Sequence, residues 1–278
     1  MKRPKWMKHS VRRIATVSTA LALLLVGGVA YAATTPAIQT FTPRSERQIT
    51  NIDVLRQQIK NYYGDPLGTG VAAPDSNYAK EASSVAADAT RALLRPHRDT
   101  TGKAIVLDVD DTTLLTWNYE IASNFAFNPT TNATFVTGQQ FSAVPGMVDL
   151  VKAAQQAGYA IFYLTGRPAA QEPDTLGNLT ADGKGIDAGY PAPTALPNGE
   201  DGLFTKPAVA DYPDYLKDAC ASDTNGSCTT LHYKTATRAH IESLGYEIVA
   251  NFGDQYSDLE GGHADHTFKL PNPTYFLP

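Results

Sequence analysis

The first residues able to do chemistry form an acidic cluster behind a short apolar run. Residues 105–107 (Ile-Val-Leu) lead directly into Asp108-Val109-Asp110-Asp111-Thr112. An apolar run bounded by turn-forming residues predicts a buried parallel strand. Open α/β sheets bind ligands at the carboxyl ends of their strands. Crowded carboxylates at such an edge repel one another unless a cation joins them, and their oxygens suit Mg²⁺. The cluster therefore indicates a metal-assisted reaction on an anionic substrate.

Other strand ends along the chain carry polar groups as well. Residues 159–164 lead into Thr165-Gly166-Arg167-Pro168, Lys234 precedes a predicted helix, and residues 246–252 lead into Gly253-Asp254, with Asp258 four positions on. Because parallel strands share one carboxyl edge, these groups can converge there. One Asp after a strand is unremarkable, but four such ends in this order are a specific signal.

The elements that must position these groups alternate along the chain from residue 103. Helices of about ten residues between strands imply right-handed βαβ units and a parallel sheet. The predicted fold is α/β: a Rossmann-like core whose central parallel sheet is flanked by helices, plus a small helical N-terminal segment. No Gly-x-Gly-x-x-Gly turn follows the first strand, which disfavours a dinucleotide site. We expect strands over 103–109, 159–164, 203–205, 246–252 and 268–270, and helices over 46–63, 78–94, 148–157 and 235–244, with a further helix after Pro168 that Pro173 interrupts.

Residues 1–32 have the layout of a secretory signal peptide. Six Lys and Arg residues precede an apolar centre over 21–26, and Ala30-Tyr31-Ala32 is an A-x-A cleavage site. We expect cleavage after Ala32, a linker over 33–45, and a secreted or extracytoplasmic protein without stable membrane association. An uncleaved anchor is the alternative, because residues 14–33 carry no charge and are nearly long enough to span a bilayer.

The net charge and the cysteine content further restrict the classes of function and the cellular compartment that fit this chain. Loss of the six basic residues takes the formal net charge from −5 to −11, which disfavours binding to nucleic acid. The two cysteines, Cys220 and Cys228, are predicted to form a local disulfide in an oxidising compartment. The five histidines that follow the predicted signal peptide show no zinc-ligand spacing and are expected to be structural or surface residues: His97, His232, His240, His263 and His266.

The four polar groups resemble motifs I to IV of the haloacid dehalogenase (HAD) superfamily of phosphotransferases. The closer resemblance is to the secreted acid phosphatases of subfamily IIIB, which holds the bacterial class C enzymes and the plant vegetative storage proteins. Residues 175–179, 251–255 and 268–273 carry this closer resemblance. It covers roughly 46–278 and implies a HAD-like phosphatase domain, with a helical part over 46–100 and an α/β core over 101–278 that contains an insert at about 181–230.

The resemblance implies a role for each motif residue. Asp108 would be the nucleophile that forms an aspartyl-phosphate, and Asp110 the general acid and base. Thr165 would donate a hydrogen bond to the phosphoryl group, and Lys234 would supply positive charge. The implied cofactor is Mg²⁺, held by four residues of which Asp110 would use its backbone carbonyl: Asp108, Asp110, Asp254 and Asp258.

The roles of several residues near the motifs are open to two interpretations. Arg167 binds phosphate or pairs with an acid, and Trp117 and Tyr119 contact the leaving group or belong to the core. Asp111 is expected to be a capping or loop carboxylate, and Lys206 competes with Lys234 for the motif III role because it also follows a strand. The expected substrate-binding residues are Thr112, Gly166, Arg167, Trp117 and Tyr119.

The sequence as a whole favours a secreted, Mg²⁺-dependent acid phosphatase that acts on small phosphate monoesters such as nucleotides. A non-catalytic binding or storage protein on the same fold is the alternative, and another HAD phosphotransfer reaction is a third reading. The presence of Asp108 with its partners favours the enzyme, and Asp110 argues against a dehalogenase. The sequence leaves the physiological substrate and the oligomeric state open.

Overall fold

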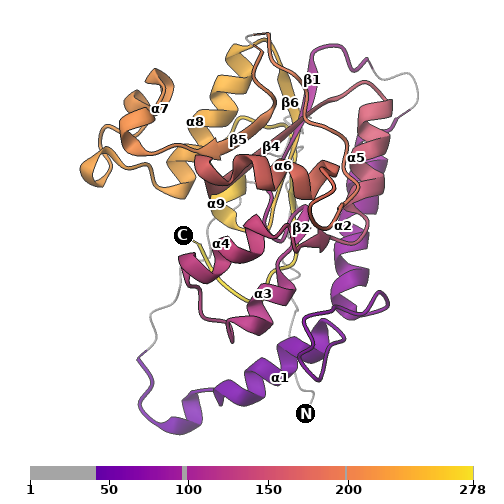
Figure 1. Ribbon diagram of the computed structural model, residues 1–278, viewed down its shortest axis with the longest axis vertical. Helices are drawn as coiled ribbons and strands as arrows, with labels where there is room; N and C mark the ends of the chain where they lie inside the picture. The colour runs from indigo at the N-terminus through magenta and orange to yellow at the C-terminus, as the bar shows by residue number, and fades with distance from the viewer. Residues whose placement is uncertain (1–41, 96–98, 198, 278) are drawn as a thin grey trace, which may run out of the picture. The chain divides into compact units, whose positions relative to one another are not determined.

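A central parallel sheet organises the chain (Figure 1). The structure is a computed structural model that describes residues 42–95, 99–197 and 199–277. The strand order is β5-β4-β1-β6-β7, and every pairing in this sheet is parallel. This confirms the predicted α/β fold. The strands are β1 (Lys103–Leu107), β4 (Ala160–Pro168), β5 (Leu203–Lys206), β6 (Glu247–Gly253) and β7 (Thr267–Lys269).

Helices cover both faces of the sheet. Successive side chains of β1 point to opposite faces, so Ile105 and Leu107 pack in one apolar cluster, and Ala104 and Val106 in another. The first cluster includes residues of α2 (Asn77–Leu93), α5 (Met147–Gln156) and α6 (Glu172–Thr180). The second includes residues of α7 (Asp214–Ala219) and α8 (Thr230–Ser243). Burial on both faces explains why β1 is apolar throughout.

Strand β1 lies at the point where the chain changes direction across the sheet. Its neighbours are β4 on one side and β6 on the other, and each is reached by a separate crossover. Such a switch point leaves a crevice at the carboxyl ends of the central strands. The residues that follow β1, β4 and β6 therefore meet at one edge of the sheet.

The remaining elements lie outside the sheet. A short antiparallel pair joins β2 (Leu114–Leu115) to β3 (Ser142–Ala143), and α3 (Trp117–Ala122) and α4 (Pro129–Thr137) lie between them in the chain. Helix α9 (Tyr256–Leu259) follows β6 directly. Helix α1 (Ile52–Tyr62) begins after Asn51, whose side chain accepts hydrogen bonds from two backbone amides. Four short 3-10 turns complete the described chain: η1 (Glu46–Gln48), η2 (Ala169–Gln171), η3 (Val209–Asp211) and η4 (Thr224–Gly226).

Several predicted boundaries were wrong. Pro173 does not interrupt a helix, because it lies in the first turn of α6, where its missing amide hydrogen costs no hydrogen bond. Helix α8 begins at Thr230, so Lys234 lies within it and not before it. The predicted helix over 46–63 is split, since Asn51 caps a new start after η1. Helices α3 and α4 fall in a stretch where no element was predicted.

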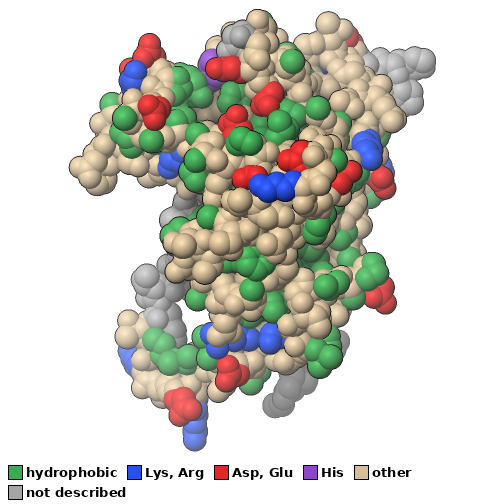
Figure 2. All heavy atoms as spheres, viewed as in Figure 1, with side chains coloured by type: hydrophobic (Ala, Val, Ile, Leu, Met, Phe, Trp, Pro, Cys, Tyr) green, Lys and Arg blue, Asp and Glu red, His purple; other side chains and the backbone are tan. Residues whose placement is uncertain are grey.

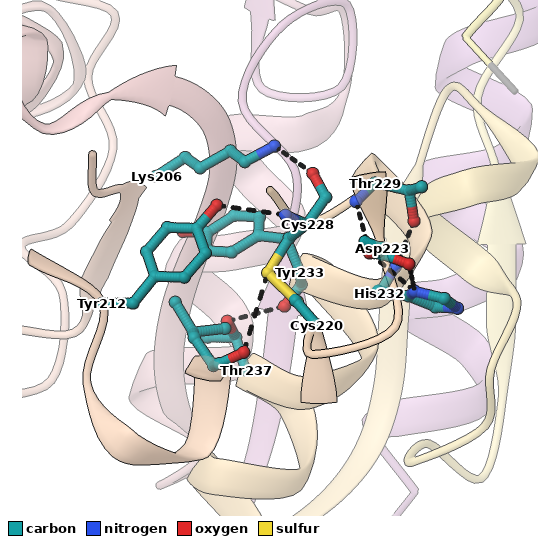
Figure 3. The surroundings of a disulfide bond; sticks show 10 residues. Lys206, Tyr212, Cys220, Asp223, Cys228, Thr229, His232, Tyr233 and Thr237 are labelled. Carbon is teal, nitrogen blue, oxygen red and sulfur yellow. Dashed lines mark hydrogen bonds and ion pairs between the residues drawn. A yellow bond between two sulfur atoms is a disulfide. The ribbon is translucent and has the colours of Figure 1, made fainter. Parts of the chain in front are cut away.

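The predicted disulfide between Cys220 and Cys228 is present (Figure 3). It joins the end of α7 to the segment that leads into α8. Lys206 Nζ donates to the Cys228 carbonyl at 2.6 Å, and the Cys228 amide donates to the Tyr212 hydroxyl at 3.2 Å. The Thr229 amide donates to Asp223 at 2.9 Å. These contacts fix the start of α8, the helix that carries Lys234.

The predicted signal peptide over 1–32 and most of the linker lie outside the described residues, as does His97. Within the described ranges, no helix combines the length and apolar character needed to cross a bilayer. The domain boundaries drawn from the sequence remain predictions.

Candidate active site

A buried lysine joins two of the motif carboxylates at the edge of the sheet. Asp108 follows β1, Lys234 lies on α8, and Asp258 lies on α9. Lys234 Nζ donates to Asp108 Oδ1 and, at 2.5 Å, to Asp258 Oδ1. Burial lowers the pKa of Lys234, but the two carboxylates outweigh it and hold the pKa above its usual value. The lysine is therefore charged, and it fixes both acids in place.

Asp254 completes a group of three buried carboxylates. Ligand oxygens of Asp108, Asp254 and Asp258 lie within 4.8 Å of one another. Burial raises the pKa of Asp108 although Lys234 opposes the shift, and burial together with Asp258 raises the pKa of Asp254 to about 7. One lysine does not balance three buried acids. A set of three hard oxygen ligands with excess negative charge fits a divalent cation. We call these three acids and Lys234 the floor of the site.

Asp110 lies beside the floor and not in it. Arg167 donates to both carboxylate oxygens of Asp110, with Nε at 3.0 and 3.2 Å and Nη2 at 2.6 Å. Arg167 Nη1 also donates to Thr175 Oγ1 at 3.0 Å. Of the two interpretations of Arg167, the structure shows the pairing with an acid. The side chain of Asp110 is 30% exposed, so it is held in one orientation while one side stays open.

The other motif residues take supporting positions. Thr165 is buried within β4, and its hydroxyl accepts a hydrogen bond from the Arg167 amide at 3.1 Å. The Thr112 hydroxyl contacts Asp254 Oδ1 at 3.4 Å from a fully buried position. Asp111 accepts from the amide and hydroxyl of Thr116, which is the loop role expected for it.

A cavity of about 830 Å³ opens over the floor. Asp108, Asp110, Gly166, Arg167 and Lys234 line it on the side of the sheet. The opposite side, which we call the wall, consists of residues from α3 and α4, the α3–α4 loop and the C-terminal segment: Tyr119, Glu120, Phe125, Phe127, Pro129, Thr130, Asn132, Ala133, Tyr275, Phe276 and Leu277.

The structure separates the two aromatic residues that were expected to contact substrate. Tyr119 belongs to the wall. Trp117 is 1% exposed and is not among the described residues that line the cavity. Its ring stacks on Tyr63 with centroids 4.0 Å apart, and its Nε1 donates to Asp65 at 3.0 Å. Trp117 therefore packs α3 against the N-terminal helices, outside the cavity lining. Thr112 is likewise absent from the cavity lining.

Comparison with known proteins shows which family the chain belongs to. A family model for the HAD superfamily, subfamily IIIB (acid phosphatase), matches residues 29–278. The chain belongs to this family. The Stem 28 kDa glycoprotein of Glycine max is 31% identical over 153 residues, and Acid phosphatase 1 of Solanum lycopersicum is 27% identical over 176 residues. The first alignment covers 54% of this chain and 50% of its relative, and the second 62% and 58%. The chain thus spans about half the length of the curated relatives it matches.

Solved structures show the same fold. The class C acid phosphatase from Bacillus anthracis with tungstate bound superposes with a TM-score of 0.53 at 18% identity. The superposition covers 80% of this chain and 85% of the other. The described sheet and its helices therefore have the same fold as that class C acid phosphatase.

In this subfamily IIIB chain, Arg238 and Gly253 position Asp258. Arg238 is fully buried on α8 and donates to backbone carbonyls around α9, to that of Asp258 at 2.6 Å and that of Gly262 at 3.0 Å. Burial lowers the pKa of Arg238 to about 10, so the side chain still carries its charge near neutral pH. A Cβ on Gly253 would lie 2.7 Å from Asp258 Oδ2, so a larger residue would displace that carboxylate.

Most residues of the wall were not predicted from the sequence. Glu120 lies on a helix that was not predicted, and Tyr275, Phe276 and Leu277 follow the last strand by several residues. Gln255 connects this segment to the floor: its Nε2 donates to Asp254 at 2.6 Å, and its Oε1 accepts from the Leu277 amide at 3.0 Å. Two apolar runs outside the predicted elements could have indicated the wall from the sequence: Phe125-Ala126-Phe127 and Tyr275-Phe276-Leu277.

Proposed function

We propose that this protein is a phosphomonoesterase that hydrolyses small phosphate monoesters through an aspartyl-phosphate on Asp108. The observation that carries the proposal is the floor itself, in which Lys234 bridges Asp108 and Asp258 with Asp254 within reach. Membership of the acid phosphatase family supports it. The whole arrangement faces a cavity large enough for a small organic phosphate.

The proposed reaction assigns one task to each side chain. Asp108 attacks phosphorus in line with the leaving oxygen, and Lys234 offsets the charge that accumulates on the phosphoryl oxygens. Asp110, oriented by Arg167, protonates the leaving alcohol and then takes a proton from the water that attacks the aspartyl-phosphate. Thr165 and the Gly166 backbone contribute hydrogen bonds to the phosphoryl group.

We propose Mg²⁺ as the cofactor, held by Asp108, Asp254, Asp258 and the backbone carbonyl of Asp110. When bound, it neutralises part of the negative charge shared by the carboxylates and the phosphoryl group. The protein's contribution is to hold three acids at close range, with Gln255 and Asn272 each donating to Asp254 at 2.6 Å.

We propose further that the mature protein is secreted after cleavage at Ala32 and acts on free small molecules. The disulfide and the family's glycoprotein relatives support an oxidising compartment. On the face seen in Figure 2, the Lys and Arg side chains of the described residues are scattered among Asp and Glu, unlike the basic stripe typical of a nucleic-acid-binding surface.

The test is hydrolysis of p-nitrophenyl phosphate by residues 33–278, with Mg²⁺ or with EDTA. We expect turnover that requires Mg²⁺ and that falls by at least about 10⁴-fold in Asp108→Asn, which keeps the shape of the side chain but removes the nucleophilic oxygen. Asp201→Asn, a loop acid outside the cavity lining, is the matched control and should retain activity.

A storage role is the second candidate, because Vegetative storage protein 1 of Arabidopsis thaliana is 46% identical over 55 residues. A folded wild-type protein without Mg²⁺-dependent turnover between pH 4 and pH 8 would favour that role. Turnover that depends on Asp108 would favour the enzyme.

A further inference from the structure

Glu120 is a buried acid of the wall without a hydrogen-bond partner for its carboxylate. The residue is 7% exposed and lines the cavity from α3. Within the described chain, its backbone forms hydrogen bonds but its carboxylate forms none. The Glu120 oxygens are not among the fully buried, unpartnered side-chain atoms of the described chain, so they are accessible from the cavity to a ligand that can donate hydrogen bonds to them.

The cationic groups near Glu120 are already engaged. Among the described residues that line the cavity, Arg167 and Lys234 are the two basic ones. Arg167 is paired with Asp110, and Lys234 is paired with two acids of the floor. The half of the cavity that receives the leaving group therefore contains a carboxylate and no available cation of the described chain. Burial, followed by the charge of Asp110, raises the pKa of Glu120 to about 7, as expected for an acid that lacks a positive neighbour.

Apart from Glu120 and the polar residues Thr130 and Asn132, the wall is largely apolar. Phe125, Phe127, Tyr275, Phe276 and Leu277 lie along it, and Phe127 is 73% exposed at the rim. Such a surface binds an aromatic or aliphatic body by removing it from water. A ligand that fills this part of the cavity thus meets mostly apolar contacts, and Glu120 is the one acid among the described residues of the wall.

We infer that Glu120 determines specificity by selecting phosphate monoesters whose leaving group carries a cationic nitrogen on an apolar body. An ammonium donates charge-assisted hydrogen bonds to the carboxylate, and the partly dehydrated cavity strengthens the attraction. A leaving group with a second anion meets repulsion from both Glu120 and Asp110, so the wall also acts against such substrates. This inference rests on the proposed phosphomonoesterase activity.

Three para-substituted aryl phosphates test the inference: 4-(aminomethyl)phenyl phosphate, phenyl phosphate and 4-carboxyphenyl phosphate. The measured quantity is the ratio of kcat/KM for the cationic ester to that for the anionic ester, compared between variants so that intrinsic reactivity cancels. We expect the ratio to fall by about tenfold or more in Glu120→Gln. Glu247→Gln is the matched control, because Glu247 pairs with Lys103 at the opposite, amino edge of the sheet, and it should keep the wild-type ratio.

The possible outcomes are distinguishable. If wild type hydrolyses none of the three esters, the proposed function fails. If phenyl phosphate is hydrolysed and Glu120→Gln keeps the wild-type ratio, the role of Glu120 is overturned while the phosphatase stands. Should Glu120→Gln not fold, wild type decides: benzylamine must inhibit phenyl phosphate hydrolysis competitively and more strongly than benzoate, and equal inhibition overturns the inference.

Discussion

The floor and the wall of the cavity are built on opposite principles. In the floor, Lys234 fixes Asp108 and Asp258, and Gln255 and Asn272 fix Asp254, so that each carboxylate is buried and hydrogen-bonded. In the wall, Phe127, Phe276 and Leu277 are 73%, 39% and 45% exposed, and the Glu120 carboxylate has no partner among the described residues. A paired and rigid floor suits transfer of the phosphoryl group, which is the same in every substrate. A partly exposed wall suits recognition of a leaving group, which differs between substrates.

The largest expected effect comes from breaking the floor. Lys234→Met should lower kcat by roughly 10²–10³-fold, because charge stabilisation of the phosphoryl oxygens is lost. It should also lower the free energy of unfolding by about 3–5 kcal/mol, because Asp108 and Asp258 stay buried without their partner. Steady-state kinetics and urea unfolding measure the two effects.

Lys206→Met is the control for that change, because Lys206, at the end of β5, was the competing candidate for the motif III role but donates to the Cys228 carbonyl. It should retain kcat within about threefold. If Lys206→Met were the inactive variant and Lys234→Met the active one, our assignment of the motif lysine would be wrong.

Removal of the Cys220–Cys228 disulfide tests whether the geometry of the floor depends on the segment that leads into α8. The double variant Cys220→Ser, Cys228→Ser should lose about 2–3 kcal/mol of stability, as expected for a closed loop of this size. Its kcat should stay near the wild-type value below the unfolding transition, because Lys234 is held by acids of the floor. Loss of activity in the folded variant, well below its own unfolding transition, would show that the disulfide shapes the floor directly.

The wall should destabilise the protein as the pH rises. The pKa of Glu120 is raised to about 7 by burial and by Asp110, so the folded protein holds this proton more tightly than the unfolded chain does. The stabilisation from this group is therefore fully present below about pH 4.5 and is lost as the pH rises through 7, by about 3 kcal/mol at most. Glu120→Gln should remove this loss in urea unfolding measured from pH 4 to pH 8. A variant with the same pH dependence as wild type would contradict the raised pKa.

The smallest expected effect concerns the link between the two regions. Ser257 Oγ donates to the Leu277 carbonyl at 3.3 Å, so Ser257→Ala should cost about 1 kcal/mol of stability. It should raise KM for an aryl phosphate more than it lowers kcat, because it loosens the wall. Ser243→Ala is the control, since its hydroxyl donates to the His240 carbonyl within α8 and should leave KM unchanged. An effect on kcat alone would contradict this prediction and would show that Ser257 acts on the floor instead of the wall.

The same comparison shows how far the sequence could predict the structure. The residues of the floor lie directly after buried strands or on the helix beside them, so a local pattern identified Asp108, Lys234, Asp254 and Asp258. The cysteine pair was readable for the same reason, since its two members are close in the chain.

The wall depends on contacts between distant segments, which local patterns do not reveal. Trp117 has the residue type expected of a substrate contact, yet its packing against Tyr63 takes it out of the cavity. Leu277 reaches the wall because Gln255 binds its amide from 22 positions away. Glu120 lies in a helix of six residues. A helix this short is less than two turns long, so its apolar residues do not form a recognisable helical period in the sequence.

The most direct test of the central claim is to trap the phosphoenzyme. Wild-type protein mixed with Mg²⁺ and an aryl phosphate is quenched in acid, digested and examined by mass spectrometry. The account predicts one phosphoryl group, on the peptide that contains Asp108, and none in Asp108→Asn. Turnover that persists in Asp108→Asn, or a phosphoryl group carried by another residue, would contradict it.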